Sequence, residues 1–243
     1  MSLSIGIVGL PNVGKSTLFN ALLGKQVADA SNYPFCTIDP NVGVVGVPDD
    51  KLPILADIVK TEKIVPAIVE FVDIAGLVKG ASQGEGLGNK FLTNIRDCDA
   101  ICHVVRAFSD SNIIKEGSVD PQGDFEVICA ELIIKDLETI DNRIGKVQKQ
   151  AQTGGDKTAK KLYEILIKFR ESLIQGKSAR SVSFDNQDDR KLAKDLCLLT
   201  DKPVLYVCNV DEKSAITGNN YVERVREAVK DENALMLIIA AKS

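Results

Sequence analysis

The residues from Gly9 to Ser16 have the spacing of a phosphate-binding loop. They read Gly-Leu-Pro-Asn-Val-Gly-Lys-Ser, which matches Gly-x-x-x-x-Gly-Lys-Ser/Thr at every fixed position. In such a loop, glycines let successive backbone N–H groups point at phosphate oxygens beside a helix N-terminus. We expect Lys15 to reach the β- and γ-phosphates of a nucleoside triphosphate and the Ser16 hydroxyl to bind Mg²⁺. The other residues expected in this phosphate site are Asn12, Val13, Gly14 and Thr17.

A carboxylate at the end of another apolar run completes a predicted magnesium site. Asp73 follows the run from Val65 to Val72 and begins the sequence Asp-Ile-Ala-Gly. An aspartate at such a strand end holds Mg²⁺ through its water shell, and the N–H of Gly76 would contact the γ-phosphate. Asp-x-x-Gly alone is common, but its position after a phosphate-binding loop favours this function.

Three loop residues bear on hydrolysis. Thr37 could bind Mg²⁺ and the γ-phosphate in a first switch loop, although the sequence leaves an ordinary loop threonine equally open. Leu77 occupies the position where many P-loop enzymes orient water with a glutamine, so we expect slow turnover. Asn12 could help to hold K⁺ near the phosphates, or it could only stabilise the loop turn. The glycine-rich stretch 80–89 is expected to act as a second switch.

The sequence Asn209-Val210-Asp211-Glu212 follows a buried-strand pattern and is the candidate base-reading site. A guanine-specific enzyme would have Asn-Lys-x-Asp here, and its aspartate would accept two hydrogen bonds from guanine. Val210 replaces that lysine and Glu212 replaces that aspartate, so we expect ATP to bind better than GTP. Asn209 could bond N7 and N6 of adenine. An ordinary loop after a strand is the alternative for an isolated Asn-x-x-Glu.

The elements that position these residues follow an α/β pattern. Near-continuous apolar runs predict a mostly parallel sheet covered by helices on both faces. The predicted strands are Ser4–Val8, Val42–Val47, Ala67–Val72, Ala100–Val105, Pro203–Cys208 and Leu235–Ala240, and the second of these could be an antiparallel edge strand. Thr17–Leu23 is expected to be helical.

One segment departs from this alternation. From residue 128 to about residue 174, apolar residues recur every three or four positions, with a turn signal at 152–156. This pattern predicts an antiparallel helical hairpin, a coiled-coil arm over 128–177, inserted into a nucleotide-binding domain made of residues 1–127 and 178–243. Lysines on its outer faces favour a solvated surface, and a partner-docking arm is the alternative.

Composition excludes several other classes of protein. The net charge of −4 argues against a chain that coats nucleic acid through charge alone. The sequence has no apolar run long enough to span a membrane and no signal-peptide pattern. The six cysteines form no Cys-x-x-Cys pair, and the one histidine, His103, lies in an apolar run. We therefore expect reduced thiols, a core histidine, no zinc site and a monomeric cytoplasmic protein.

The motifs together resemble those of one family. The chain resembles the YchF family of Obg-related P-loop proteins, also called Obg-like ATPases. The residues that carry this resemblance are Gly6–Asn20, Asn32–Asn41, Asp73–Asn89, His103–Arg106 and Asn209–Glu212. The resemblance implies a Ras-like nucleotide-binding domain with an inserted helical arm, a preference for ATP with weaker GTP binding, and action on the ribosome or translation apparatus. It also implies that Ala240, Ala241 and Lys242 form the remaining base-side loop. Members of this family continue into a small β-rich TGS domain, which this sequence, ending at Ser243, lacks.

The expected function is therefore that of a Mg²⁺-dependent ATP-hydrolysing molecular switch. A GTPase is the first alternative. A nucleotide-gated binding protein that barely hydrolyses is the second alternative, and Leu77 is the feature that motivates it.

Overall fold

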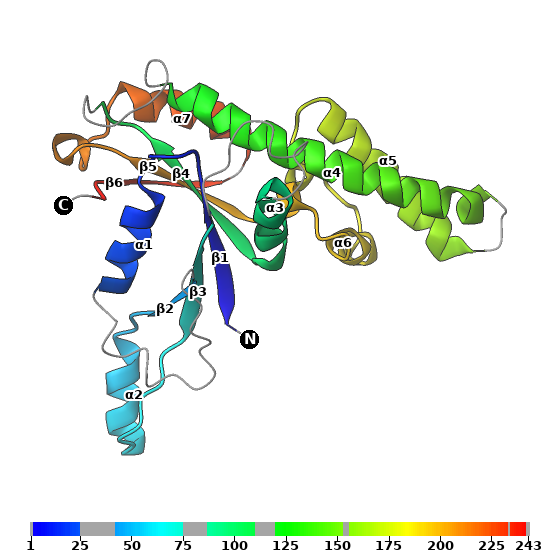
Figure 1. Ribbon diagram of the computed structural model, residues 1–243. Coiled ribbons are helices and arrows are strands. Elements are labelled where there is room, and N and C mark those ends of the chain that lie inside the picture. Colours follow the sequence, from blue (N-terminus) through cyan, green and yellow to red (C-terminus); the bar gives the residue numbers. More distant parts are fainter. Residues whose placement is uncertain are drawn as a thin grey trace.

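The fold is built on a six-stranded mixed sheet (Figure 1). The computed structural model describes residues 2–24, 42–74, 87–109, 120–152, 156–232 and 234–241. The strand order is β2-β3-β1-β4-β5-β6, and only β2 runs antiparallel to its neighbour. The strands are β1 (Leu3–Val8), β2 (Val42–Gly46), β3 (Ile68–Asp73), β4 (Ala100–Arg106), β5 (Val204–Asn209) and β6 (Leu235–Ile239). All six predicted strands and the antiparallel edge strand are confirmed.

Helices connect these strands. They are α1 (Lys15–Gly24), α2 (Lys51–Val59), α3 (Leu87–Asp97), α4 (Pro121–Gln152), α5 (Lys157–Ile174), α6 (Gln187–Lys194) and α7 (Asn220–Val229). Short 3₁₀ turns are η2 (Ala179–Ser181), η3 (Leu199–Asp201), η4 (Glu212–Ser214) and η5 (Lys230–Glu232). The sequence did not predict α2, which extends away from the sheet between β2 and β3 (Figure 1) and buries only Ala56.

Alternate side chains of the central strands point to opposite faces, and different helices cover each face. On one face, α1 packs Phe19 against a cluster that includes Ile7 of β1 and Val104 of β4. On the other face, α3 and α4 cover Val8 and Ile101, and α7 covers the far half of the sheet. Both faces of the central strands are therefore covered, whereas β6 at the edge of the sheet exposes Leu235 and Leu237.

The predicted helical hairpin is present, but its first helix begins earlier than expected. We expected the hairpin to start at residue 128, whereas α4 starts at Pro121 and crosses residue 128 without a break. Its first turns are part of the main core, because Phe125 and Ile128 are buried against the sheet. Beyond them, α4 and α5 form their own core with Ile140 and Phe169 at 0% exposure, and the two helices project from the sheet (Figure 1).

A buried carboxylate fixes the base of this hairpin. Asp136 on α4 is 0% exposed. It accepts hydrogen bonds from the backbone N–H groups of Leu199 and Thr200, both at 2.8 Å, and from the Thr200 hydroxyl at 2.7 Å. Burial raises the pKa of Asp136, while these bonds act in the opposite direction. The carboxylate thus anchors α4 to the turn that precedes β5.

Three further predictions concern membrane-spanning helices, the cysteines and His103. Within the described ranges, no helix is both long enough and apolar enough to cross a bilayer. The five described cysteines, at positions 98, 102, 129, 197 and 208, are free thiols, as expected. His103 is a core residue, with its ring centroid 5.8 Å from that of Phe125 and 5.6 Å from that of Tyr206.

Candidate functional site

The predicted phosphate-binding loop joins β1 to α1 and depends on two glycines. Gly9 has φ +156°, and a Cβ there would lie 2.5 Å from the Val104 carbonyl oxygen. Gly14 has φ +101°, and a Cβ there would lie 2.3 Å from Nδ2 of Asn209. Because neither position has room for a side chain, the loop can pass close to β4 and β5 only with glycine at both.

Lys15 opens α1 and lies under the loop. Its side chain is nearly buried, and its Nζ donates a hydrogen bond to the Leu10 carbonyl at 2.9 Å. Burial lowers the pKa of Lys15, and the nearby Asp73 carboxylate opposes that effect. A phosphate group would offer this ammonium stronger, charge-assisted bonds than the carbonyl does.

Ser16 and Asp73 meet at the ends of neighbouring strands. β1 and β3 are parallel, with Ile7 opposite Asp73, so their carboxyl ends lie together. The Ser16 hydroxyl donates to Oδ2 of Asp73 at 3.0 Å. One hydroxyl and one carboxylate are oxygen ligands that suit Mg²⁺, which in nucleotide sites takes its other ligands from phosphates and water. The described residues contain no cluster of three or more His, Cys, Asp or Glu side chains that could bind a metal by itself.

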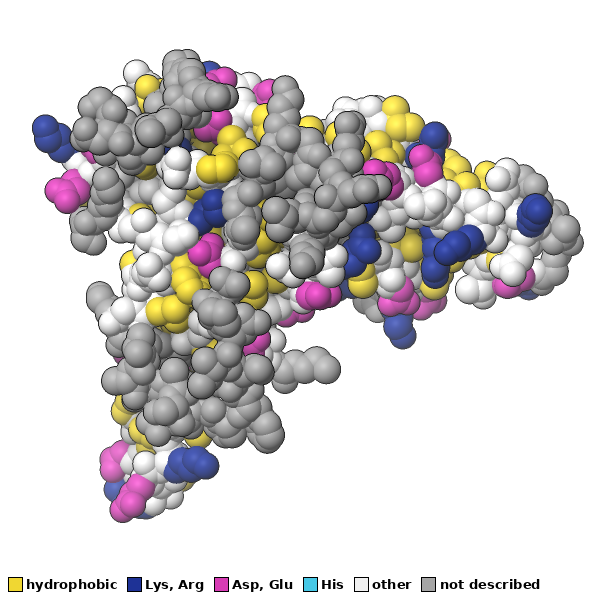
Figure 2. Space-filling view, viewed as in Figure 1, with side chains coloured by type: hydrophobic (Ala, Val, Ile, Leu, Met, Phe, Trp, Pro, Cys, Tyr) yellow, Lys and Arg dark blue, Asp and Glu magenta, His cyan; other side chains and the backbone are white. Residues whose placement is uncertain are grey.

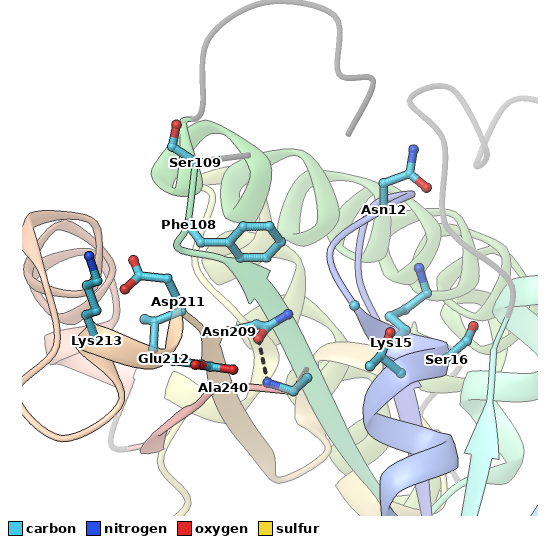
Figure 3. Close-up of a pocket in the computed structure, with 14 residues that line it drawn as sticks. Asn12, Lys15, Ser16, Phe108, Ser109, Asn209, Asp211, Glu212, Lys213 and Ala240 are labelled. Carbon is cyan, nitrogen blue, oxygen red and sulfur yellow. Dashed lines mark hydrogen bonds between the residues drawn. The ribbon is translucent and has the colours of Figure 1, made fainter. Parts of the chain in front are cut away.

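Asn209, at the end of β5, links two loops. Its Nδ2 donates to the Val13 carbonyl at 2.9 Å, and its Oδ1 accepts from the Ala241 N–H at 3.1 Å (Figure 3). The residue is only 5% exposed. The second N–H of the Asn209 amide has no part in these two bonds and remains a donor for a ligand. Asn209 therefore braces the phosphate loop against the loop after β6.

The phosphate loop, the end of β5 and the loop after β6 surround one pocket of about 940 Å³. Figure 3 shows the phosphate-loop side chains of Asn12, Lys15 and Ser16 on one side and the turn that carries Glu212 on the other, with the Phe108 ring between them. The pocket is lined by Asn12, Gly14, Lys15, Ser16, Thr17, Phe108, Ser109, Asn209, Val210, Asp211, Glu212, Lys213, Ala240 and Ala241. It lies at the carboxyl ends of the parallel strands, where open α/β sheets bind ligands.

Sequence reasoning missed four lining residues: Phe108, Ser109, Asp211 and Lys213. Phe108 follows β4, the strand next to β1, so the rule that ligands lie at strand carboxyl ends could have found it. The Arg106 guanidinium carbon lies 4.8 Å from the Phe108 ring centroid, and Arg106 Nε donates to the Phe108 carbonyl. These contacts hold the aromatic ring at the pocket.

Other predicted residues are placed differently or lie outside the described ranges. The side chain of Val13 is buried beneath the loop, and only its carbonyl serves the site, through Asn209. Val210 is 4% exposed and packs in the core as well as lining the pocket. Asp73 contacts Ser16 and does not line the pocket itself. The remaining predicted residues, Thr37, Gly76, Leu77 and Lys242, lie outside the described residues.

Comparison with known proteins places the chain among P-loop nucleotide-binding proteins. The family model described as the 50S ribosome-binding GTPase matches residues 4–139, more than half of the chain. Ribosome-binding ATPase YchF of Bacillus subtilis (strain 168) is 56% identical over 245 residues, and the protein of the same name from Haemophilus ducreyi is 50% identical over 242 residues. The chain belongs to the YchF family. These alignments cover 100% and 99% of this chain and 66% of each relative.

A solved YchF structure supports the fold assignment. The structure described as the Schizosaccharomyces pombe YchF GTPase superposes with a TM-score of 0.83 at 36% sequence identity. It covers 99% of this chain, and this chain covers 66% of it. The α/β sheet and the long helical hairpin are therefore shared with a YchF protein over the whole described chain. The chain spans 66% of the length of the YchF relatives it matches.

Proposed function

We propose that the chain binds Mg²⁺–ATP in this pocket, hydrolyses it slowly, and acts as a nucleotide-controlled switch on the ribosome or its translation factors. The observation that carries the proposal is the meeting of three features at one edge of the sheet. These are the Lys15 ammonium beneath a phosphate loop, the Ser16–Asp73 pair at 3.0 Å, and the Asn209 brace between the phosphate loop and the base-side loop.

The phosphate side would work by positioning and charge. Lys15 would exchange its bond to the Leu10 carbonyl for β- and γ-phosphate oxygens, while backbone N–H groups of the loop hold the phosphates. Mg²⁺, held by the Ser16 hydroxyl and through water by Asp73, would neutralise charge on the transferred phosphate. We propose that Thr37 and Gly76 complete this site, with Thr37 on the metal and Gly76 on the γ-phosphate.

The base side favours adenine over guanine. Val210 offers an apolar, buried side chain where a guanine-specific site would carry a lysine, and Glu212 is an exposed carboxylate on a longer stem than aspartate. The remaining N–H donor of Asn209 could bond adenine N7, and Phe108 offers an aromatic face for either purine. The two names given to relatives, ATPase in Bacillus subtilis and GTPase in Schizosaccharomyces pombe, keep a GTPase as the alternative.

Slow hydrolysis follows from the residue after the Asp-x-x-Gly motif. Leu77 has no group that could orient or deprotonate water. Asn12, which lines the pocket with a left-handed φ of 61°, is the candidate for holding K⁺ beside the phosphates, where a cation would offset developing charge. If no such assistance exists, the chain would be a nucleotide-gated binding protein with negligible turnover.

Competition binding tests the nucleotide proposal. Fluorescent ATP and GTP analogues are titrated at equal Mg²⁺ and displaced with unlabelled nucleotides, and single-turnover hydrolysis is then measured in K⁺ and in Na⁺. We expect tighter ATP binding and faster hydrolysis in K⁺. A clear preference for GTP would show that Glu212 reads guanine. Equal rates in the two salts would refute the role of K⁺.

The proposed partner is supported by the family model, whose description names the 50S ribosome, and by the names of the bacterial relatives. A ribosomal partner would place the protein in the cytoplasm. Cosedimentation with ribosomes, measured with ATP, with ADP and without nucleotide, tests the switch directly. Equal binding in all three states would show that the nucleotide does not control the interaction.

A further inference from the structure

The arm changes sign of charge along its length. Residues 121–142 of α4 carry six acidic residues and one lysine, whereas residues 143–152 carry three basic residues and no acidic one. α5 begins at the same end of the arm, with three lysines among its first five residues. Since the net charge of the protein is −4, the outer end of the arm is opposite in sign to the molecule as a whole.

The charges at this end are exposed. We define the distal basic surface as Arg143, Lys146, Lys149, Lys157 and Lys160, all of which are exposed. Figure 2 shows Lys and Arg side chains spread along the visible face of the projecting arm, with acidic side chains among them. Three other basic residues of the arm are in ion pairs: Lys135 with Glu138, Lys161 with Asp189, and Arg170 with Asp141.

The stability of the helices does not account for these lysines. Basic residues near the C-terminus of α4 interact favourably with its helix dipole. Lys157 and Lys160, in contrast, lie at the N-terminus of α5, where the dipole disfavours positive charge. Asp156 caps this end by accepting hydrogen bonds from the Thr158 and Ala159 N–H groups, and one carboxylate does not balance the lysines that follow it. The α4 and α5 basic groups also lie at the same end of the hairpin and repel one another. The arrangement therefore points to an anionic partner.

Among its described residues, the outer end of the arm exposes no large apolar side chain to a protein partner. Val147 and Ala159 are buried between the helices, and Ile144 and Ala151 are partly buried. The large exposed apolar side chains of the arm that the structure describes, Ile134 and Ile174, lie near its base. A partner at the outer end would therefore be held by charge, as a phosphate backbone is. At 32 residues, α4 is about 48 Å long, so its end can reach a recessed surface.

We propose that the distal basic surface docks on the phosphate backbone of ribosomal RNA in the large subunit. The inference rests on the proposed binding to the ribosome and names the surface responsible for it. The nucleotide pocket is on the sheet, while the docking surface is at the far end of the arm (Figure 1). Changes to this surface should therefore leave ATP affinity unchanged.

The test replaces four charges and retains helix-forming residues, because glutamine has a helix propensity close to that of lysine. Affinity for purified 50S subunits is measured at several KCl concentrations. The docking variant combines Arg143→Gln, Lys146→Gln, Lys157→Gln and Lys160→Gln, and the control variant combines Lys51→Gln, Lys63→Gln, Lys177→Gln and Lys194→Gln, four exposed lysines elsewhere. We expect the docking variant to lose affinity about tenfold or more, and its slope of log K against log[salt] to fall by about 3. The control variant should stay within about twofold of the wild type.

Each other outcome has a distinct meaning. Equal affinity and salt slope for the docking variant and the wild type would overturn the inference while leaving ribosome binding intact. An equal loss in the control variant would show that overall charge, not this surface, is responsible. If free ribosomal RNA does not compete with 50S subunits, the anionic partner is a protein and the RNA assignment is wrong. If the wild type does not bind 50S subunits, both the ribosomal partner and this inference fail. ATP affinity and a thermal melt of each variant confirm that it is folded.

Discussion

Replacing Asn209 with alanine should weaken the phosphate site even for a ligand that has no base. The change removes the bond from Nδ2 to the Val13 carbonyl at 2.9 Å and the bond from the Ala241 N–H to Oδ1 at 3.1 Å. At about 1 kcal/mol for each net hydrogen bond, the free energy of unfolding should fall by about 2 kcal/mol, and more if the freed groups stay buried. For a domain of this size that corresponds to a Tm lower by about 4–8 °C.

The decisive assay uses Mg²⁺–tripolyphosphate, which carries the phosphates of ATP without its base. If Asn209 braces the phosphate loop, its loss should reduce tripolyphosphate affinity about tenfold, or about 1.4 kcal/mol. Glu212→Gln is the matched control, because Glu212 lines the same pocket on the base side. It should alter the ratio of ATP to GTP affinity and leave tripolyphosphate affinity and Tm unchanged. If Asn209→Ala retains the wild-type Tm and tripolyphosphate affinity and loses only ATP affinity, the residue acts on the base alone and the bracing argument is wrong.

Three further predictions concern the metal, the base and pH. Asp73→Asn should remove the dependence of ATP affinity on Mg²⁺, and ATP titrations with Mg²⁺ and with EDTA would show this. Phe108→Leu removes the ring held by Arg106, so ATP and GTP should both bind about 2- to 13-fold more weakly while tripolyphosphate binds as before; an unchanged ATP affinity would exclude stacking. Burial lowers the pKa of His103 to about 4; the positive charges of Arg180 and Lys15 lower this pKa further, and the Glu232 carboxylate opposes them. As pH falls through 6.5, the histidine therefore gains a proton only in the unfolded chain. Stability from this group is therefore complete above pH 6.5 and is lost as pH falls towards 4, by about 2 kcal/mol at pH 5. His103→Phe should abolish that part of the decline in chemical denaturation, and equal slopes for the two proteins would contradict it.

The central strands were predictable because they are covered on both faces. A strand such as β4 must be apolar at nearly every position, and this leaves a continuous run in the sequence. The phosphate loop was predictable for a different reason, since its glycines are required at Gly9 and Gly14 by the close approach of β4 and Asn209. In both cases the physical constraint acts on adjacent residues, so a single sequence retains it.

Other features depend on contacts that a local pattern does not contain. The start of α4 was placed at residue 128, where the spacing of the hairpin core begins, yet the helix begins at Pro121 because its first turns pack on the sheet. α2 escaped prediction because its apolar residues are spread around the helix instead of forming one face, and several of them, including Ile54, Leu55 and Ile58, are exposed. The position of Phe108 in the pocket also required the strand order, since β4 and β5 are adjacent in the sheet and far apart in sequence.

The strand that carries Asn209 also connects the nucleotide pocket to the base of the arm. Tyr206, three residues earlier on β5, donates its hydroxyl to Glu232 at 2.6 Å, and Glu232 accepts from Arg180 at 2.9 Å. Arg180 follows the arm in sequence and also donates to the carbonyl of Thr200, the residue that binds Asp136 on α4. Burial by itself would raise the pKa of Glu232, but the Arg180 guanidinium and the hydrogen bonds lower it, so the pair is a charged one. This charged pair is partly buried, so breaking it is costly, and the arm base and β5 are therefore held as one unit. A shift of the strand end at Asn209 would then reach the base of the arm through this chain of hydrogen bonds. In the part of the chain that the structure describes, the outer end of the arm has no comparable link to the sheet.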